Sequence, residues 1–157
     1  MRKQPAKEIA GNRCVNLLSV SPVADDHIAL EHILARPGWA NYSDSRWTLS
    51  WSATLGSATA ALSQDRVPIV ICERDLDGNS WIDLLAEATA LPEPPYVIVT
   101  SRLADEHLWA EALNLGAYDV LAKPFDPEEV IRVVSLAWLH WREQKMDAAP
   151  KVMRCVA

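Results

Sequence analysis

Three polar side chains stand where short apolar runs end, and their chemistry suits a charged binding site. They are Glu73, Thr100 and Lys123. A carboxylate, a hydroxyl and an ammonium group in one place can bond to each other or hold a charged ligand. The residues at the ends of these apolar runs do not provide the nucleophile, base and orienting group that nucleophilic catalysis needs. The sequence therefore predicts a binding or signalling protein and not an enzyme.

Other reactive residues do not form recognisable sites. The four histidines are scattered, and the three cysteines lack the C-x-x-C spacing of zinc sites, so no metal site is expected. The chain also lacks the glycine-rich loops that bind dinucleotides or nucleoside phosphates. The G-x-S-x-G turn of serine hydrolases is absent from the sequence as well.

Length and charge disfavour further classes of protein. The chain has 157 residues, of which 50% are hydrophobic, enough for one domain with a core. Its 21 acidic and 15 basic residues give a net charge of −6, which disfavours nucleic-acid binding. The apolar stretches are too short to cross a membrane, and no secretory signal begins the chain. Because the cysteine pattern also suits a reducing compartment, we expect a cytoplasmic protein.

Apolar periodicity alternates between strand and helix from residue 13 to residue 143. Continuous or alternating apolar runs predict five strands, over Val15–Val20, Arg46–Ala53, Val67–Cys72, Tyr96–Thr100 and Tyr118–Ala122. Between and after these strands, apolar residues at helical spacing predict five helices. Residues 1–12 are expected to form a flexible polar lead-in, and residues 144–157 a frayed tail.

Local signals also predict helix ends. Ser80 followed by Asp83 suits a capping box, Gly116 stands where a left-handed C-cap belongs, and Asp126-Pro127 suits the start of the last helix. Strands that alternate with helices predict an α/β fold with a parallel sheet covered on both faces. The doubly wound order 2-1-3-4-5 is expected at this size. Functional groups of such folds lie at the carboxyl ends of the strands, where the three polar side chains fall.

These segments resemble the receiver domain of two-component response regulators. The resemblance is carried by Tyr96–Thr100 and by Leu115–Phe125, which run as a strand ending in Thr, a helix, Gly-Ala, a strand and Lys-Pro-Phe. Val67–Gly78 is similar to the family's third strand and the loop after it. The resemblance covers residues 13–143 and implies a flavodoxin-like receiver fold.

The resemblance implies a phosphorylation switch and assigns its parts to residues of this chain. In the family, an Asp at the end of the third strand receives a phosphoryl group from a kinase histidine, and Glu73 falls at that position. Two acidic residues after the first strand hold Mg²⁺, and Ser21 and Pro22 fall there. The Thr and Lys that contact the phosphoryl group are matched by Thr100 and Lys123.

Glu73, Ser21 and Pro22 differ from the acidic residues that the family has at these positions. These differences predict a degenerate receiver that is not phosphorylated on Glu73. A glutamate carboxylate is one methylene longer than that of aspartate, and phosphoryl transfer depends on positioning. Because Ser21 and Pro22 supply no anionic ligand, Mg²⁺ binding should be weak or lost, and no cofactor is expected. Glu73 is expected to reach Lys123 and Thr100 and to imitate the phosphorylated state. The imitation is incomplete, because Glu73 carries about one negative charge where phosphoaspartate carries nearly two.

Alternative interpretations remain open. Asp75 or Asp77 could accept phosphate in a working response regulator, although both suit the turn before Gly78. A flavodoxin-like module that binds a small molecule above the strand ends is the candidate from another class. Asp25-Asp26 could form a displaced metal pair, but acidic residues in a first helical turn have a simpler role in stabilising the helix.

The expected mode of action is protein–protein contact. Because only a short tail follows residue 143, we expect a stand-alone module whose partner is a histidine kinase, another regulator or an output protein, with a homodimer also possible. Trp109 and Trp138, on the fourth and fifth predicted helices, form the predicted partner surface, since aromatic residues are enriched at interfaces. The alternative for each tryptophan is packing within the domain.

Overall fold

The fold is a parallel sheet between two layers of helices. The computed structural model describes residues 14–36 and 46–156, with side chains described up to residue 145. The predicted lead-in over residues 1–12 lies outside the described residues. The sheet contains β1 (Cys14–Val20), β2 (Arg46–Ser52), β3 (Ile69–Glu73), β6 (Tyr96–Ser101) and β7 (Asp119–Ala122). Its order is β2-β1-β3-β6-β7, which confirms the predicted order 2-1-3-4-5.

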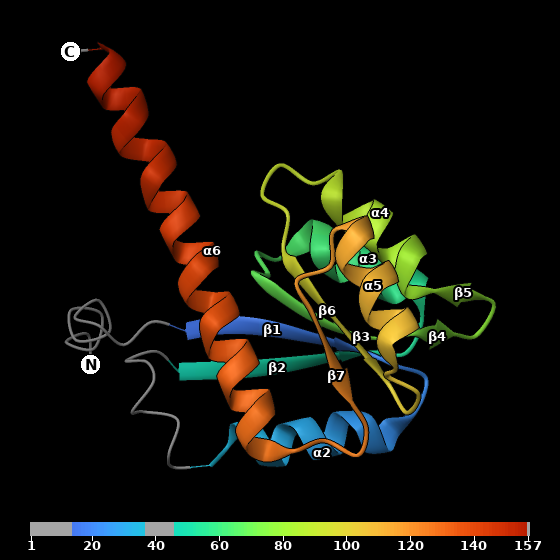
Figure 1. The fold of residues 1–157 in the computed structure, drawn as a ribbon. Helices are drawn as coiled ribbons and strands as arrows, with labels where there is room; N and C mark the ends of the chain where they lie inside the picture. Colours follow the sequence, from blue (N-terminus) through green and yellow to red (C-terminus); the bar gives the residue numbers. More distant parts are fainter. Residues whose placement is uncertain (1–13, 37–45, 157) are drawn as a thin grey trace.

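Helices cover both faces of this sheet (Figure 1). The helices are α2 (Ala24–Leu34), α3 (Leu55–Gln64), α4 (Trp81–Thr89), α5 (Glu106–Leu115) and α6 (Pro127–Val156). Helices α2 and α6 lie on one face, and α3, α4 and α5 lie on the other. Each connection between parallel strands must cross over the sheet, which is why a helix follows each strand.

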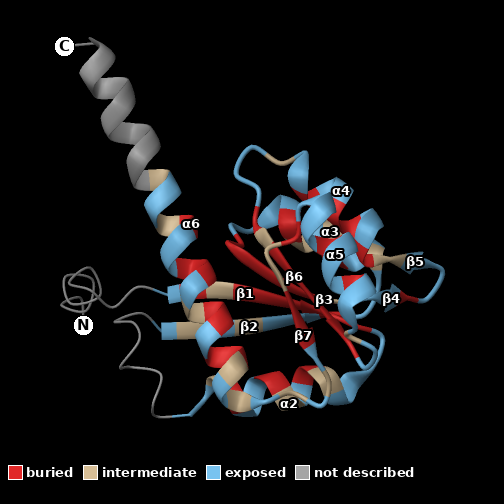
Figure 2. Ribbon diagram, in the orientation of Figure 1, coloured by how far each residue is buried: buried red, intermediate tan, exposed pale blue. Residues whose placement is uncertain are grey.

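The strands are buried on both faces, so their alternate side chains enter two different cores. On β1, Leu18 and Val20 pack with α3, α4 and α5, whereas Val15 and Leu17 pack with α2 and α6. Figure 2 shows the central strands as buried and the outer surfaces of the helices as mostly exposed. This two-sided burial explains why β3 and β6 are continuous apolar runs in the sequence.

Helix ends lie where the local signals predicted them. The Ser80 hydroxyl accepts a hydrogen bond from the Ile82 N–H (3.2 Å), and the Asp83 carboxylate accepts one from the Ser80 N–H (3.0 Å). Gly116 ends α5 in the left-handed region, with a φ of 110°. The Asp126 carboxylate accepts a hydrogen bond from the Glu128 N–H at the start of α6 (3.2 Å). Side chains that stop and start helices here act locally, within a few residues.

A small hairpin forms where the sequence predicted only a turn. Strands β4 (Asp75–Leu76) and β5 (Asn79–Ser80) pair in antiparallel fashion between β3 and α4. Gly78 turns the chain with a φ of 84°, a conformation that glycine adopts without steric cost. The hairpin anchors itself through Leu76, which is 1% exposed, while Asp75 and Asp77 remain exposed.

The last helix is longer than the sequence predicted. A frayed tail was expected from residue 144, but α6 continues to Val156, so that expectation is wrong for the backbone. Residues 142–149 read Arg-Glu-Gln-Lys-Met-Asp-Ala-Ala and consist mostly of strong helix formers, which extend the helix past the sheet. The predicted boundary after residue 143 therefore falls inside a helix.

Candidate functional site

The parallel register brings the predicted site residues to one edge of the sheet. Glu73, at the end of β3, is the register partner of Thr100 on β6. Ser101 is in turn the partner of Ala122 on β7, so Lys123 follows at the same edge, and its N–H donates to the Ser101 carbonyl (3.0 Å). The sheet thus joins three residues that lie far apart in sequence.

Lys123 is the centre of a charged cluster. Its ammonium group forms ion pairs with Asp26 (2.8 Å) and with Glu73. The Thr100 hydroxyl donates to the same Glu73 oxygen (3.3 Å). The three charged side chains are only 10–13% exposed. Two carboxylates and one ammonium in a partly desolvated place leave the cluster with one net negative charge.

The surroundings of Lys123 favour its charged form. Desolvation by burial opposes the charge, but hydrogen bonds to Asp26 and Glu73 outweigh it and raise the pKa of Lys123 above its ordinary value. Lys123 therefore remains an ammonium ion throughout the physiological range. Its peptide bond to Pro124 is cis.

Asp26 is the site residue that the sequence did not assign. It lies in the first turn of α2, as expected for a helix-start acid, but its carboxylate also binds Lys123 and accepts a hydrogen bond from the Ser21 hydroxyl (2.7 Å). Ser21 in turn accepts a hydrogen bond from the Val23 N–H (3.1 Å), which fixes the turn that presents Asp26. The only sequence signal for this role was the Asp25-Asp26 pair itself.

A buried histidine, His27, contacts the same turn at Ser21. The two ring nitrogens of His27 lie 2.8 Å from the Ser19 hydroxyl and 3.0 Å from the Ser21 carbonyl. Its ring also stacks on Trp51 at the end of β2, with centroids 4.8 Å apart. Because a carbonyl can only accept, the Ser21 contact requires a proton on Nε2 of His27. His27 therefore links β1, β2 and α2.

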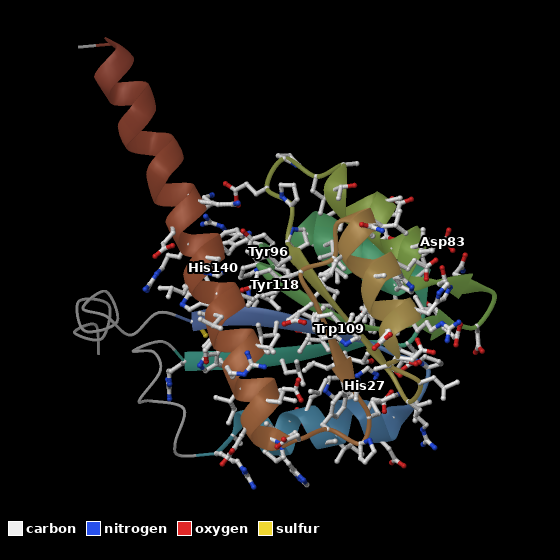
Figure 3. The ribbon with its side chains drawn as sticks, in the orientation of Figure 1. His27, Asp83, Tyr96, Trp109, Tyr118 and His140 are labelled. Carbon is white, nitrogen blue, oxygen red and sulfur yellow. The ribbon has the colours of Figure 1, made fainter. Side chains whose placement is uncertain are left out.

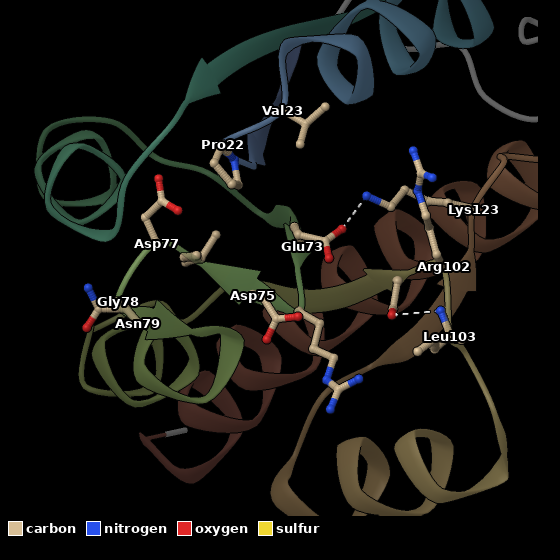
Figure 4. Close-up of a pocket in the computed structure, with 13 residues that line it drawn as sticks. Pro22, Val23, Glu73, Asp75, Asp77, Gly78, Asn79, Arg102, Leu103 and Lys123 are labelled. Atoms are coloured by element: carbon tan, nitrogen blue, oxygen red, sulfur yellow. Dashed lines mark hydrogen bonds and ion pairs between the residues drawn. The ribbon is translucent and has the colours of Figure 1, made fainter.

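An open pocket of about 710 Å³ adjoins the cluster (Figure 4). Glu73 and Lys123 line it together with Asp75 and Asp77, the two alternative acceptors. Asp75 and Asp77 are exposed and form no ion pair with any described residue. The structure thus places Glu73, Asp75 and Asp77 around one pocket. Of these three carboxylates, only that of Glu73 contacts Lys123.

The potential metal ligands and thiols of the described residues give no further reactive group beside the cluster. Among the described residues, no three His, Cys, Asp or Glu side chains are arranged to hold one metal ion. Cys72 lies next to Glu73 in sequence but is fully buried. Burial, together with the charge of Glu73, raises the pKa of its thiol. Cys72 is therefore a core residue and not a nucleophile.

The two predicted partner-surface tryptophans differ in exposure. Trp109 is 38% exposed on α5 and remains available for contact, and Figure 3 shows its position on the ribbon. Trp138 is 8% exposed, packs edge-on against Trp47 and stacks on Trp141, so its assignment to the partner surface is wrong. Its helical position faces the sheet, and a large aromatic ring there fills the core beside β2.

The described part of the chain offers no helix with both the length and the apolar character needed to cross a membrane.

Comparison with known proteins identifies the family. A sequence model described as the response regulator receiver domain matches residues 23–135. The DNA-binding transcriptional regulator NtrC of Proteus hauseri is 36% identical over 97 residues, which cover 61% of this chain and 19% of that protein. The transcriptional regulatory protein FixJ of Azorhizobium caulinodans is 31% identical over 112 residues, covering 68% of this chain and 53% of that protein.

The chain therefore spans about half or less of the length of these relatives. Among solved structures, a signal receiver domain from an HD domain-containing protein of Pseudomonas fluorescens superposes with a TM-score of 0.72 at 23% identity, covering 86% of this chain and 94% of the other. That likeness confirms the flavodoxin-like receiver fold. These matches favour a receiver over the small-molecule module that the sequence left open. With more than half of its residues matched by the family model, this chain belongs to the response regulator receiver domain family of two-component signalling.

Proposed function

We propose that this chain is a receiver that is not phosphorylated on Glu73 and that signals through protein–protein contact. The observation that carries the proposal is the bonding of Glu73. Its carboxylate contacts both Lys123 and Thr100, the two residues that the family resemblance assigns to the phosphoryl group. Glu73 would then supply a permanent, partial substitute for a phosphorylated aspartate.

The same bonding argues against Glu73 as a phosphate acceptor. Phosphorylation by a small donor requires a carboxylate oxygen to attack phosphorus while the bond from phosphorus to the donor oxygen breaks. The Oε1 atom of Glu73 is already bonded to an ammonium and a hydroxyl, and these two bonds fix the orientation of the whole carboxylate. Positioning accounts for most of phosphoryl-transfer catalysis, so this arrangement should be unreactive.

We further propose that Mg²⁺ binds weakly or not at all. The ion requires several oxygen ligands in near-octahedral geometry. Of the carboxylates at this edge, Asp26 and Glu73 are already bonded to Lys123, so a cation would have to replace those bonds to use them as ligands. Ser21 and Pro22 provide no carboxylate to replace them. The residues therefore do not fit the family's metal site, and no step of the proposed function uses one.

Intact-mass spectrometry after incubation with acetyl phosphate and Mg²⁺ tests the proposal. We expect the mass of the wild-type chain to stay unchanged. A phosphoryl adduct that disappears in Glu73→Gln would show that Glu73 accepts phosphate and would overturn the proposal. The Glu73→Asp variant is the informative companion, because an adduct in that variant alone would show that the extra methylene of Glu73 prevents transfer.

A second candidate function has support from the pocket. Asp75 and Asp77 line the same pocket as Glu73 and their carboxylates are unpaired among the described residues. A phosphoryl adduct that persists in Glu73→Gln and disappears in Asp75→Asn or Asp77→Asn would identify a relocated acceptor. The chain would then be a working phosphorylation switch.

The proposal that Glu73 partly imitates a phosphorylated aspartate needs a separate measurement. Backbone amide NMR spectra of the wild type, Glu73→Gln and Glu73→Asp should differ beyond the site, with shifts that spread from Thr100 towards α5. Glu73→Gln keeps the size of the side chain and removes its charge, so it isolates the electrostatic contribution. If the shifts of Glu73→Gln stay within the residues next to position 73, Glu73 does not set the state of the domain.

The partner class follows from the family. Receivers of two-component systems contact histidine kinases and output proteins, and we propose that this chain does the same through an exposed surface that includes Trp109. Trp109→Ala should weaken that contact without weakening the fold. A second copy of the chain is an alternative partner for the same surface, and sedimentation of the wild type against Trp109→Ala separates the two cases.

A further inference from the structure

Helix α6 meets the rest of the domain a second time, far from the charged site. Its first turns follow β7, and its residues 130–141 cover one face of the sheet. It then passes the opposite edge of the sheet, where the strands begin, and its last part extends away from the other helices (Figure 1). Lys145 is the last side chain of α6 that the structure describes, and it is bonded to the loop between α4 and β6.

An aromatic ring forms the base of this second contact. The indole N–H of Trp141 donates to the Pro94 carbonyl (3.1 Å), and the residue is 6% exposed. Arg66 and Lys145 each hold a cationic group near the same ring, at 5.3 Å and 5.2 Å from its centroid. Cations at this distance from an indole are attracted by the ring's electron density.

A single carboxylate joins both cations. Glu93 forms an ion pair with Arg66 (3.2 Å), from the loop between α3 and β3, and with Lys145 on α6. The hydrogen bond from Lys145, followed by the charge of Arg66, lowers the pKa of Glu93 although partial desolvation opposes the shift. Three segments that are distant in sequence therefore meet at one anion.

A contact that involves neither Glu93 nor Lys145 lies earlier on α6, at His140. The Tyr118 hydroxyl and Nδ1 of His140 are 2.7 Å apart, and the Tyr118 ring stacks on Tyr96 (4.8 Å). Figure 3 shows Tyr96, Tyr118 and His140 close together where α6 passes the start of the sheet. This contact does not involve Glu93, so it serves as an internal reference for the charged one.

The geometry points to a charge clasp, formed by Arg66, Glu93, Trp141 and Lys145, that sets the direction in which α6 leaves the domain. We propose that α6 beyond Trp141 is a movable output element and that neutralising Glu93 releases it. The release is local, because the buried residues of α6 between Val130 and Trp138 remain packed on the sheet.

The exposure of the clasp makes this release feasible. The side chains of Arg66, Glu93 and Lys145 are 61%, 47% and 31% exposed. Ion pairs so open to water contribute little individually and are screened within about 8 to 10 Å at physiological salt. A partner with its own cationic groups could therefore compete for Glu93 without unfolding the domain.

Hydrogen exchange measured by mass spectrometry on the full chain tests the clasp. In Glu93→Gln we expect amides of residues 141–149 to exchange roughly three- to tenfold faster, since local opening follows the loss of local contacts. Amides of residues 128–138 should keep their wild-type rates. One molar KCl should accelerate the same segment in the wild type and have little further effect in Glu93→Gln. The matched control is Glu87→Gln, because Glu87 is exposed on α4 and has no ion pair among the described residues.

Two outcomes would overturn the clasp. Equal rates over residues 141–149 in Glu93→Gln and the wild type would show that the ion pairs do not hold α6. Faster exchange throughout the chain, or equal acceleration by Glu87→Gln, would show a general loss of stability and no local device. A urea titration of each variant, followed by far-ultraviolet circular dichroism, distinguishes local from global change.

Discussion

The ammonium group of Lys123 lies 2.8 Å from the carboxylate of Asp26, although 97 positions separate the two residues in the chain. This pair joins the end of β7 to the first turn of α2. It also gives Lys123 a second carboxylate besides Glu73, so that the charge of the lysine is balanced without any ligand. Lys123 is therefore already bonded to two carboxylates, and the cluster keeps one net negative charge, which distinguishes it from a pocket that awaits an anion.

The first prediction concerns the stability that Asp26 provides. We expect Asp26→Asn to lower the free energy of unfolding by about 1–2 kcal/mol, because Lys123 loses one charged hydrogen bond and Ser21 loses a charged acceptor. The loss stays below the roughly 3–5 kcal/mol of a fully broken buried pair, since Glu73 still binds Lys123. Urea denaturation measures the difference. Asp25→Asn is the control, because Asp25 is exposed on the same helix turn and should change stability by less than about 0.5 kcal/mol.

The second prediction concerns the pH dependence of stability. The pKa of Lys123 is raised in the folded state, so its contribution is fully present below its unfolded pKa of 10.5 and is lost as the pH rises through the higher folded pKa. Wild-type protein should therefore lose stability above about pH 10.5 more steeply than Lys123→Met. Denaturation midpoints between pH 8 and pH 12 supply the comparison. Parallel curves for the two proteins would contradict the bonded role of Lys123.

The fold was predictable because its signals are local or periodic. Alternation of strand and helix patterns reflects burial on two faces, and each helix end depends on side chains within one turn, as at Ser80 and Gly116. The meeting of Glu73, Thr100 and Lys123 was also predictable, because parallel strands end at the same edge of a sheet.

The features that the sequence did not predict depend on tertiary contacts. Asp26 looked like an ordinary acid of a first helical turn, and nothing near it in sequence indicates Lys123. Trp138 looked like a candidate surface residue, because helical periodicity does not tell how far the inward face of α6 extends around the helix. The hairpin of β4 and β5 is made of two-residue strands, too short for any alternation to be visible.

The third prediction distinguishes the two tryptophans. Trp138→Ala should lower the free energy of unfolding by about 3–5 kcal/mol, the usual cost of removing a large core aromatic side chain. Trp109→Ala should cost less than about 1 kcal/mol, because the side chain is 38% exposed. Urea denaturation of both variants tests the contrast, and Trp138→Phe serves as the conservative control. A small decrease in the free energy of unfolding for Trp138→Ala would mean that Trp138 is not a core residue.

The last prediction concerns the reactivity of the cysteines. Burial raises the pKa of the Cys72 thiol, and the negative charge of Glu73 raises it further, so the reactive thiolate is scarce in the folded protein. Cys14 is exposed at the start of β1. With iodoacetamide at pH 8, we expect peptide mapping to find Cys14 alkylated within minutes and Cys72 unmodified until urea unfolds the chain. The rate of alkylation at Cys72 then reports opening of the core beside the site.

The Glu73→Gln variant removes the neighbouring charge but leaves Cys72 buried, so alkylation of Cys72 should remain slow in that variant. Rapid alkylation would mean that Glu73 keeps this edge of the sheet closed.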